Sequence, residues 1–363
     1  MTSMHSIPAS GDAGFSLIEI VVSSALLLLV VAAAIAVANP VIDAARSQPE
    51  AIVLQQRARV AAGSLLRDLY AAGAGPDSGD PTGSLGAHLA TILPRRIGTK
   101  SPDPPAGSRA DVVSVIWVPI TRAQTTLVAP FATTPMAVRQ EGGCPITQPA
   151  CGVKAGMGLL LFDRSGAFDL LTAESVDSSG VVSRLRGPVP SHSYSDDARV
   201  VEVEARTYYV DAATKQLRQY DTDNTDAPLM DDVVDMTMEY FGAVAPPMFP
   251  KPPVGQANCL YDSAGQRLPG MSHLSAGEDG LAPLPIDVFN DGPWCGSGAL
   301  VYDADLLRIR RVRVTLRLQV SSPALRASGE RFANAGTSRS ALRSVPDAIV
   351  SFDVSPRNLA GVQ

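Results

Sequence analysis

The sequence predicts an α+β protein: a long N-terminal helix, its first half transmembrane, packed on an antiparallel β-sheet head with long loops. Three observations predict this fold. Residues 15–38 are almost uninterrupted apolar residues, residues 54–72 repeat apolar side chains at helical spacing, and most later segments alternate with the period of a strand. A helix followed by many strands with short turns favours an antiparallel sheet.

Length and composition set broad limits on the protein. The chain has 363 residues, enough for one large or two modest domains beyond the helix. Its 30 glycines and 29 prolines indicate a head rich in turns and long loops. The net charge of −6 gives no sign of the strongly basic surface that nucleic-acid binding requires, so we expect no nucleic-acid partner.

The apolar run at the N-terminus contains a single charged residue, Glu19. An ionisable side chain inside a membrane span is unfavourable and usually has a function. Residues 20–38 would form a helix about 28 Å long, which matches a hydrocarbon core of about 30 Å. Cleavage after Gly14 would leave a new amine on Phe15, four residues from this acid.

Two alternatives also explain the apolar run. A plain membrane anchor leaves Glu19 and the Gly14-Phe15 junction unexplained. An ordinary secretory signal would be cleaved after Ala38, at an A-x-A-like site, but the run exceeds a typical apolar core of about 7–15 residues and no basic residue precedes it. The mature N-terminus separates these cases, because a secreted protein would begin at Asn39.

A second helical stretch is predicted after the apolar run. Asn39-Pro40 predicts a kink or a short break, and Ser47 and Glu50 have the spacing of a capping box. One apolar stripe follows, formed by Leu54, Ala58, Ala61, Leu65, Leu69 and Ala72. Gly73 and Gly75-Pro76 end the helix.

Strand-like patterns occupy much of the remaining chain. We expect strands at 112–118, 158–163, 167–171, 199–210, 215–220, 233–241, 308–319 and 348–354. Turns are predicted at Arg164-Ser165-Gly166 and at 211–214, and a bulge at Arg310-Arg311. Residues 242–305 resemble a Pro/Gly-rich insertion between strands.

All four cysteines follow the apolar run. They are Cys144, Cys151, Cys259 and Cys295. If the run crosses an inner membrane, they lie in an oxidising compartment, where three pairings are possible. We favour Cys144–Cys151 and Cys259–Cys295, because each closes a local loop that buries little apolar surface. A zinc site is disfavoured because paired C-x-x-C spacing is missing.

The run Gly-Phe-Ser-Leu-Ile-Glu, from Gly14 to Glu19, resembles the N-terminus of type IV prepilins and of type II secretion pseudopilins. The resemblance implies that a prepilin peptidase cuts between Gly14 and Phe15 and methylates the amine of Phe15, and that Glu19 acts in assembly. Arg67-Asp68-Leu69 followed by Ala71-Ala72-Gly73 is similar to PilW-type minor pilins and J-type pseudopilins.

The resemblance also implies a domain plan. Residues 1–14 would be the leader peptide, 15–39 the transmembrane and fibre-core helix, 40–73 its amphipathic second half, and 74–363 the periplasmic or extracellular head with the loop-rich insertion at 242–305. The chain would reside in the inner membrane as a single-pass protein with a periplasmic head, and then in the pilus fibre at the cell surface.

The function implied is that of a minor pilin subunit that primes assembly at the tip of a type IV pilus. Its partners would be the prepilin peptidase, other minor and major pilins and the inner-membrane assembly platform. The alternative is a J-type pseudopilin of type II secretion. An alternative of another class is a pilus-tip adhesin or DNA-uptake protein, with the loops between Pro246 and Trp294 as its binding surface.

We predict no catalytic residues, no cofactor and no metal. His88, His192 and His273 fall in separate polar loops without a neighbouring acid pattern, and no nucleophile elbow, Walker A sequence or H-E-x-x-H motif is present.

Two clusters of charged residues have alternative interpretations. Asp221, Asp223 and Asp226 crowd one loop and are a calcium candidate, although a solvated turn is favoured because the EF-hand glycine is missing. A basic cluster could form a nucleic-acid patch and contains Arg308, Arg310, Arg311, Arg313 and Arg317. We favour a salt-bridged strand face for it, because neighbouring strands can supply acids opposite.

Overall fold

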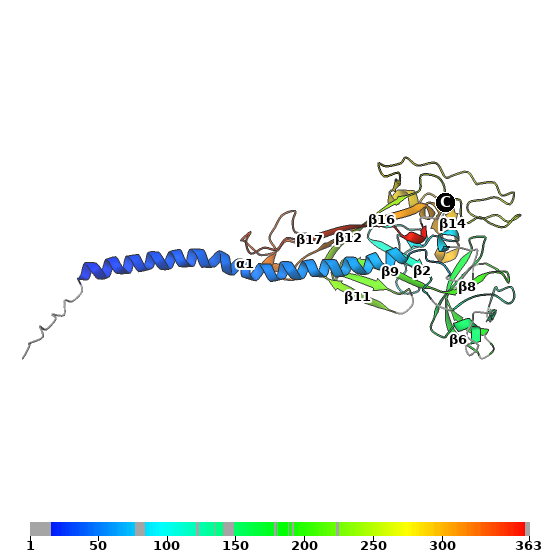
Figure 1. Ribbon diagram of the computed structural model, residues 1–363, viewed down its shortest axis with the longest axis horizontal. Helices are drawn as coiled ribbons and strands as arrows, with labels where there is room; N and C mark the ends of the chain where they lie inside the picture. The colour runs from blue at the N-terminus through cyan, green and yellow to red at the C-terminus, as the bar shows by residue number, and fades with distance from the viewer. Residues whose placement is uncertain are drawn as a thin grey trace, which may run out of the picture. The chain divides into compact units, whose positions relative to one another are not determined.

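The computed structural model describes residues 16–76, 84–120, 123–133, 135–140, 149–177, 179, 181–187, 189–190, 192–222 and 225–359. They form an α+β protein with one N-terminal helix followed by antiparallel sheets (Figure 1). The chain divides into two compact units. The first holds the residues up to Val53 together with Ser322–Pro346, and the second holds Leu54–Ser321 and the segment from Asp347 onward.

The helix α1 runs without interruption over Leu17–Ala71. A kink or a short break was expected at Asn39-Pro40; the break is wrong, and so is a new helix start at Ser47, whereas a kink stays a prediction. An internal proline removes one backbone donor and its ring crowds the preceding turn, but the alanine- and leucine-rich turns before it have high helix propensity. Ser47 caps no helix; its hydroxyl donates to the carbonyl oxygen of Leu342, 3.2 Å away.

Within the described residues, the strands that follow α1 form four antiparallel sheets, which we call the body together with the loops between them. The five-stranded sheet has the order β1 (Ile92–Leu93), β2 (Val112–Trp117), β9 (Glu204–Asp211), β10 (Gln216–Tyr220) and β11 (Asp226–Asp231). The four-stranded sheet has the order β13 (Ala282–Leu284), β12 (Val233–Gly242), β16 (Ile309–Leu318) and β17 (Ala348–Val354). The six-stranded sheet has the order β3 (Gln124–Thr126), β8 (Arg199–Glu202), β5 (Gly158–Phe162), β6 (Phe168–Val176), β7 (Val181–Arg186) and β4 (Met136–Ala137). A two-stranded ribbon pairs β14 (Trp294–Cys295) with β15 (Tyr302–Asp303).

Short 3-10 helices connect these strands. They span Leu85–Ala87, Pro149–Gly152, Ile286–Phe289, Gly298–Leu300, Ala304–Arg308, Pro323–Leu325 and Arg357–Leu359.

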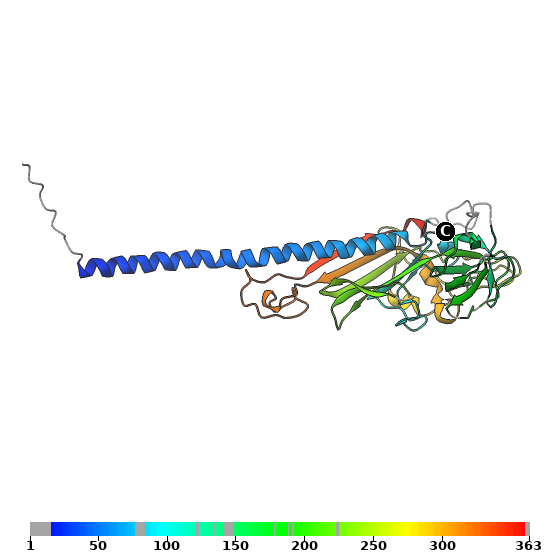
Figure 2. The same cartoon turned by 90° about the horizontal axis from the view of Figure 1, so that it is seen from below.

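The second half of α1 packs on the body as its apolar stripe predicts. All six stripe residues are buried, and Leu65, Leu69 and Ala72 are fully inaccessible to solvent. Figures 1 and 2 both show these turns of the helix beside the long strands, and Arg57 pairs there with Asp232, just before β12. Burial of this stripe fixes the helix on the sheets, since each large apolar side chain removed from water contributes about 1.5–3 kcal/mol.

Most of the predicted strands are present. The hairpin around Arg164-Ser165-Gly166 is confirmed as β5–β6, and the turn at 211–214 joins β9 to β10. The bulge is confirmed as well: Phe241 pairs with Arg311 and Gly242 with Ile309, which leaves Arg310 as the extra residue.

The single strand predicted over 199–210 is wrong. The chain leaves the six-stranded sheet after Glu202 and enters the five-stranded sheet at Glu204. Val203 lies between the two strands, and its N–H donates to the carbonyl oxygen of Gly158. The two sheets therefore share one continuous stretch of chain, which a period-2 pattern alone cannot divide.

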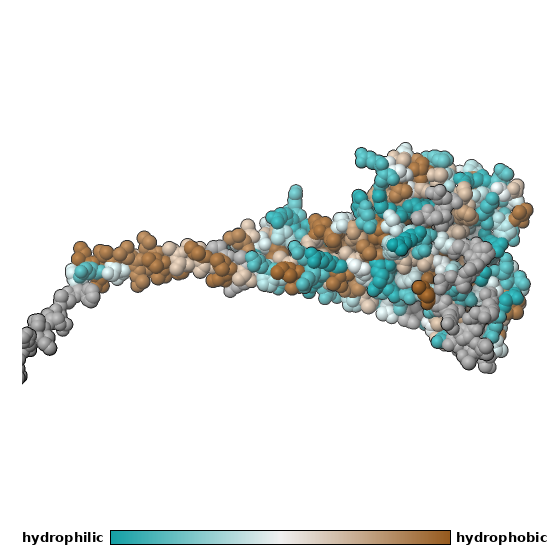
Figure 3. Space-filling view, in the orientation of Figure 1, coloured by the Kyte–Doolittle hydropathy of each residue, from teal (hydrophilic) through white to brown (hydrophobic). Residues whose placement is uncertain are grey.

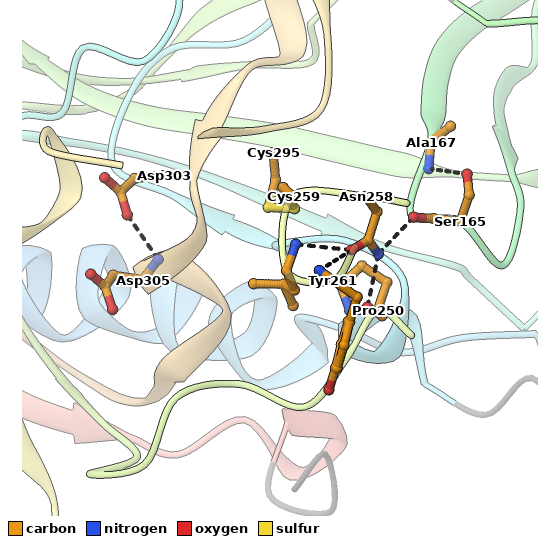
Figure 4. Close-up of a disulfide and its surroundings, with 10 residues drawn as sticks. Ser165, Ala167, Pro250, Asn258, Cys259, Tyr261, Cys295, Asp303 and Asp305 are labelled. Atoms are coloured by element: carbon orange, nitrogen blue, oxygen red, sulfur yellow. Dashed lines mark hydrogen bonds between the residues drawn. A yellow bond between two sulfur atoms is a disulfide. The ribbon is translucent and has the colours of Figure 1, made fainter. Parts of the chain in front are cut away.

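The Cys259–Cys295 disulfide is confirmed, with a sequence separation of 36 residues (Figure 4). Beside it, the Asn258 amide group donates to the carbonyl oxygens of Ser165 and Pro250, and its side-chain oxygen accepts from the N–H groups of Leu260 and Tyr261. The Pro/Gly-rich insertion is thus held to the β5–β6 turn. Cys151 is also disulfide-bonded, whereas Cys144 lies outside the described residues.

Candidate functional site

The first half of α1 exposes an apolar surface on every side. Among the described residues, Leu17–Ala38 is the helical stretch long and apolar enough to cross a membrane, judged by length and composition, and none of it is buried. Leu27 is 64% exposed and Leu29 is 67% exposed. Figure 3 shows this stretch as a nearly continuous hydrophobic surface. An exposed patch of this kind marks an interaction site, because water disfavours it.

Glu19 lies in the first turn of this apolar stretch. Its carboxylate folds back toward the helix N-terminus, where Oε2 accepts a hydrogen bond from the N–H of Ser16 at 2.9 Å. A negative charge is stabilised there by the free N–H groups and by the helix dipole. The Ser24 hydroxyl donates to the carbonyl oxygen of Ile20 and so satisfies itself within the helix.

The sequence also singled out Gly14 and Phe15. Both lie outside the described residues, so the cleavage site and the N-methylation of Phe15 stay predictions. The carboxylate of Glu19 nevertheless points toward the end of the helix at which Phe15 precedes Ser16.

A buried ionic cluster holds the second half of α1 to the body. Asp68, on the helix, is 2% exposed. Its Oδ2 lies 2.9 Å from Nη1 of Arg206 and accepts a hydrogen bond from the hydroxyl of Tyr208 at 2.5 Å; both partners lie on β9. Arg206 also pairs with Glu204 at 2.7 Å and lies over the ring of Trp117. Asp68 therefore joins the helix to the middle of the five-stranded sheet.

The electrostatics of this cluster follow from burial. Desolvation raises the pKa of Tyr208, and its hydrogen bond to Asp68 raises it further. Tyr208 is thus a neutral donor. Loss of solvation on burial lowers the pKa of the Arg206 guanidinium, but the charge and hydrogen bond of Asp68 together with the charge of Glu204 outweigh this effect, so the pKa of Arg206 is raised. Arg67-Asp68-Leu69 was noted from the sequence; Arg206 and Tyr208 were missed as its partners.

The histidines do not all lie in polar loops without acids. His88 is buried, with its ring 4.9 Å from that of Phe162. His192 lies near an acid after all, with Nε2 3.4 Å from Oδ2 of Asp163. The Ser165 hydroxyl donates to Asp163, whereas a nucleophilic triad would bond the serine to the histidine. This arrangement of hydrogen bonds is typical of a turn and not of an activated nucleophile.

The calcium candidates are only partly described, because Asp223 lies outside the described residues. Asp226 pairs with Arg218 at 2.9 Å and accepts from the hydroxyl of Tyr209, and Asp221 accepts from the N–H of Thr225. These contacts suit a turn and a strand edge. The solvated turn stays the favoured prediction for this loop, and calcium binding stays the alternative.

Three other carboxylates converge near the disulfide: those of Asp291, Asp303 and Asp305. Asp303 accepts backbone N–H groups from Asp291, Gly292 and Asp305, as Figure 4 shows for Asp305. Asp305 pairs with Arg308 at 2.6 Å. Burial raises the pKa of Asp305 to about 6. The carboxylates of Asp303 and Asp305 thus have partners within the chain that account for their positions.

The basic strand face is matched by acids, as expected, at Arg311, Arg313 and Arg317. Arg313 pairs with Asp353 and Arg317 with Asp347, each at 2.8 Å, and Arg311 pairs with Asp279. Arg308 does not lie on the exposed face. It is 1% exposed and donates to the carbonyl oxygens of Val244 and Ser272. The chain turns into a 3-10 helix before β16, which directs this side chain inward.

A cleft of about 670 Å³ lies in the body between the six-stranded and five-stranded sheets. Leu170, Leu171 and Val203 line it together with Arg186 and Arg206. The loops predicted as a binding surface, between Pro246 and Trp294, do not contribute to this lining.

Comparisons with protein-family models, with curated proteins and with solved structures found no match to this chain. The fold and the exposed helix define an α+β protein whose N-terminal helix could serve as a membrane anchor or as a signal sequence. Function is therefore inferred from the helix, its acid and its attachment to the body.

Proposed function

We propose that the chain is a type IV pilin-like subunit, a minor pilin of the PilW type that primes pilus assembly at the tip. The observation that carries the proposal is the helix α1. It joins an exposed apolar stretch containing a single acid, Glu19, to a stripe buried against an antiparallel body, without a break. A cleaved secretory signal would not need to continue into a helix pinned to the folded domain.

The proposed role of Glu19 is to neutralise the methylated amine of Phe15, in its own chain or in a neighbouring subunit. The orientation of the carboxylate toward the helix N-terminus supports this role. An unpaired carboxylate in lipid costs on the order of a few kcal/mol, so a positive amine at the same depth favours the paired arrangement. Without this pair, entry of the helix into the fibre core would leave a charge buried.

The proposed location follows from the same helix. The apolar stretch lies in the inner membrane with the body in the periplasm, and then moves into the helical core of the fibre. The prepilin peptidase would act between Gly14 and Phe15. Other minor and major pilins would pack on the exposed surface of Leu17–Ala38, and the inner-membrane assembly platform would extract the chain.

The test compares processing with incorporation in cells that make the proposed fibre. We expect Gly14→Ala to block processing, so that mass spectrometry of the N-terminus no longer finds methylated Phe15. We expect Glu19→Ala to leave processing intact but to remove the protein from sheared fibres. Ser23→Ala, one turn further along the helix, is the matched control and should be incorporated normally. Normal incorporation of the Glu19 variant would refute the mechanism, and a mature N-terminus at Asn39 would refute the proposed class.

The same helix supports a J-type pseudopilin of type II secretion, since both machines use an N-terminal helix of this kind. The deletion strain distinguishes them: loss of twitching motility supports the minor pilin, and loss of protein secretion supports the pseudopilin.

A further inference from the structure

A long connection joins two paired strands of the four-stranded sheet. Leu318, at the end of β16, pairs directly with Ala348, at the start of β17. A short turn would join two such strands, yet the chain inserts Ser322–Pro346, which we call the basic loop. Connections longer than about 12–15 residues without regular structure are usually functional.

The basic loop carries positive charge in an acidic protein. It contains four arginines and one acid, Glu330, whereas the whole chain has a net charge of −6. Arg331, Arg339 and Arg343 are exposed, and Arg326 is buried. Leu342 is 60% exposed beside Arg343. Exposed arginines next to an exposed leucine are typical of surfaces that bind anionic membranes, where the side chains meet phosphates and the apolar group enters the interface.

The basic loop is held in one shape by its own backbone. The N–H of Val345 donates to the carbonyl oxygen of Leu325, and that of Thr337 donates to Pro323, each at 2.8 Å. Gly336 is required where the two arms cross, because a Cβ there would lie 2.3 Å from the carbonyl oxygens of Pro323 and Arg326. The exposed arginines therefore belong to a loop whose conformation is fixed by backbone hydrogen bonds.

The loop belongs to the same compact unit as the apolar stretch of α1. Leu342 accepts the hydrogen bond from Ser47, and Figures 1 and 2 both show the orange-red loop beside the helix. Ser47 lies nine residues beyond Ala38, the last residue of the apolar stretch. At 1.5 Å per residue this is roughly 14 Å along the helix.

That distance places the loop at the surface of a bilayer. Headgroups extend about 5–8 Å beyond the hydrocarbon core on each side, and the field of anionic lipids persists for a further Debye length of about 8–10 Å. The part of the loop that contacts Ser47, at Leu342 and its neighbour Arg343, falls within this zone when Leu17–Ala38 spans the membrane.

We propose that the basic loop docks on the phosphate groups of anionic lipids at the membrane surface where α1 emerges. The proposal rests on the membrane-resident state of the proposed function. Docking sets the depth of the helix in the bilayer until the chain is extracted into the fibre. Arg331, Arg339 and Arg343 bind the headgroups, and Leu342 inserts between them.

The experiment uses the full chain, one copy per nanodisc, in discs of phosphatidylcholine alone or mixed equally with phosphatidylglycerol. Hydrogen–deuterium exchange of residues 322–346 is measured by mass spectrometry. We expect exchange to be about tenfold slower in the anionic discs, and high salt to remove the difference. The triple variant Arg331→Gln, Arg339→Gln and Arg343→Gln should lose the slowing. The matched control, Lys251→Gln with Arg267→Gln, neutralises exposed charges outside the loop and should keep it.

The other outcomes each overturn a different statement. Equal exchange in both lipids, or slowing by inorganic phosphate in neutral discs, refutes docking on lipid. Slowing that appears only with several copies per disc assigns the loop to a neighbouring subunit. A chain that stays outside the discs refutes the anchor and both proposals with it. A chain that inserts and docks, but whose mature N-terminus is not Phe15, refutes the pilin-like function and leaves loop docking standing.

Discussion

The two halves of helix α1 obey different constraints although one continuous helix contains both. Leu27, in the first half, is 64% exposed, whereas Leu65, in the second, is fully buried. The first half is apolar on all sides, and the second is apolar along one stripe. A helix that is apolar all round requires lipid or other helices around it, whereas a striped helix needs one packed face. The comparison separates what the body requires for folding from what remains available to partners.

The acids of the two halves differ in the same way. Asp68 is bonded to Arg206 and Tyr208 of β9, so its charge is satisfied within the body. Glu19 accepts a hydrogen bond from its own helix, at Ser16. A buried acid with partners in the chain stabilises the fold, whereas an acid on an unpacked apolar helix suits a partner supplied from outside.

The largest effect should come from truncating the buried stripe. We expect Leu65→Ala to lower the free energy of unfolding of the body by about 2–5 kcal/mol, because it removes buried apolar contacts and leaves a cavity. Denaturant unfolding in detergent, followed by the fluorescence of Trp117 and Trp294, measures the change.

Leu27→Ala is the matched control, with the same substitution on the same helix. It should change the free energy of unfolding of the body by less than about 0.5 kcal/mol, as exposed sites usually do. Equal losses from the two variants would show that both halves are parts of one folding unit, and the comparison would fail.

The next effect concerns the ionic cluster. Asp68→Asn keeps an acceptor of the same shape but removes the charge that faces Arg206. We expect a loss of about 1–3 kcal/mol, because Arg206 loses its buried counter-charge and keeps only the more exposed Glu204. The neighbouring Arg67→Gln is the control, since the side chain of Arg67 is 72% exposed and its pair with Asp68 should contribute less than about 1 kcal/mol. An unchanged midpoint of denaturant unfolding for Asp68→Asn would show that the apolar stripe alone holds the helix on the body.

The sequence predicted correctly those elements whose side-chain spacing is set within a short stretch of chain. The stripe from Leu54 to Ala72 and the β5–β6 hairpin follow from side chains three, four or two residues apart. Pro40 misled the prediction, because a local helix breaker was outweighed by the helix-forming turns around it. Val203 was missed as a boundary, because nothing in its own neighbourhood says that two different sheets receive the strands on either side.

The candidate site divides in the same way. Glu19 stands out in the sequence because it is the single charge in an apolar run. The partners of Asp68 lie 138 and 140 residues away in the chain, so only the folded sheet brings them together. The burial of Arg308 likewise depends on Ser272 and Val244, from loops with no pattern of their own. The arginines of the basic loop could be counted in the sequence, but the contact of the loop with Ser47, at Leu342, could not be predicted from it.

The smallest expected effect is the change in the free energy of unfolding with pH, which we assign to a group of the body alone. Burial raises the pKa of Asp305 to about 6, whereas an unfolded aspartate titrates near 3.9. The folded state therefore binds the proton more tightly, and stability falls as the pH rises from about 4 to about 6. We expect a decrease of about 2 kcal/mol over this window, less than the full pKa difference implies, because part of the titration of each state lies outside the window.

Asp305→Asn should flatten this part of the profile, measured by denaturant unfolding at a series of pH values. Asp279 is the control, because its hydrogen bond with Arg311 lowers its pKa. Its contribution to stability is lost only as the pH falls below about 4, so Asp279→Asn should leave the slope between pH 4 and 6 unchanged. A slope that persists in Asp305→Asn would place the titrating group elsewhere. If that slope vanished in a chain lacking the first half of α1, the two halves of the helix would be energetically coupled, contrary to the separation that their burial indicates.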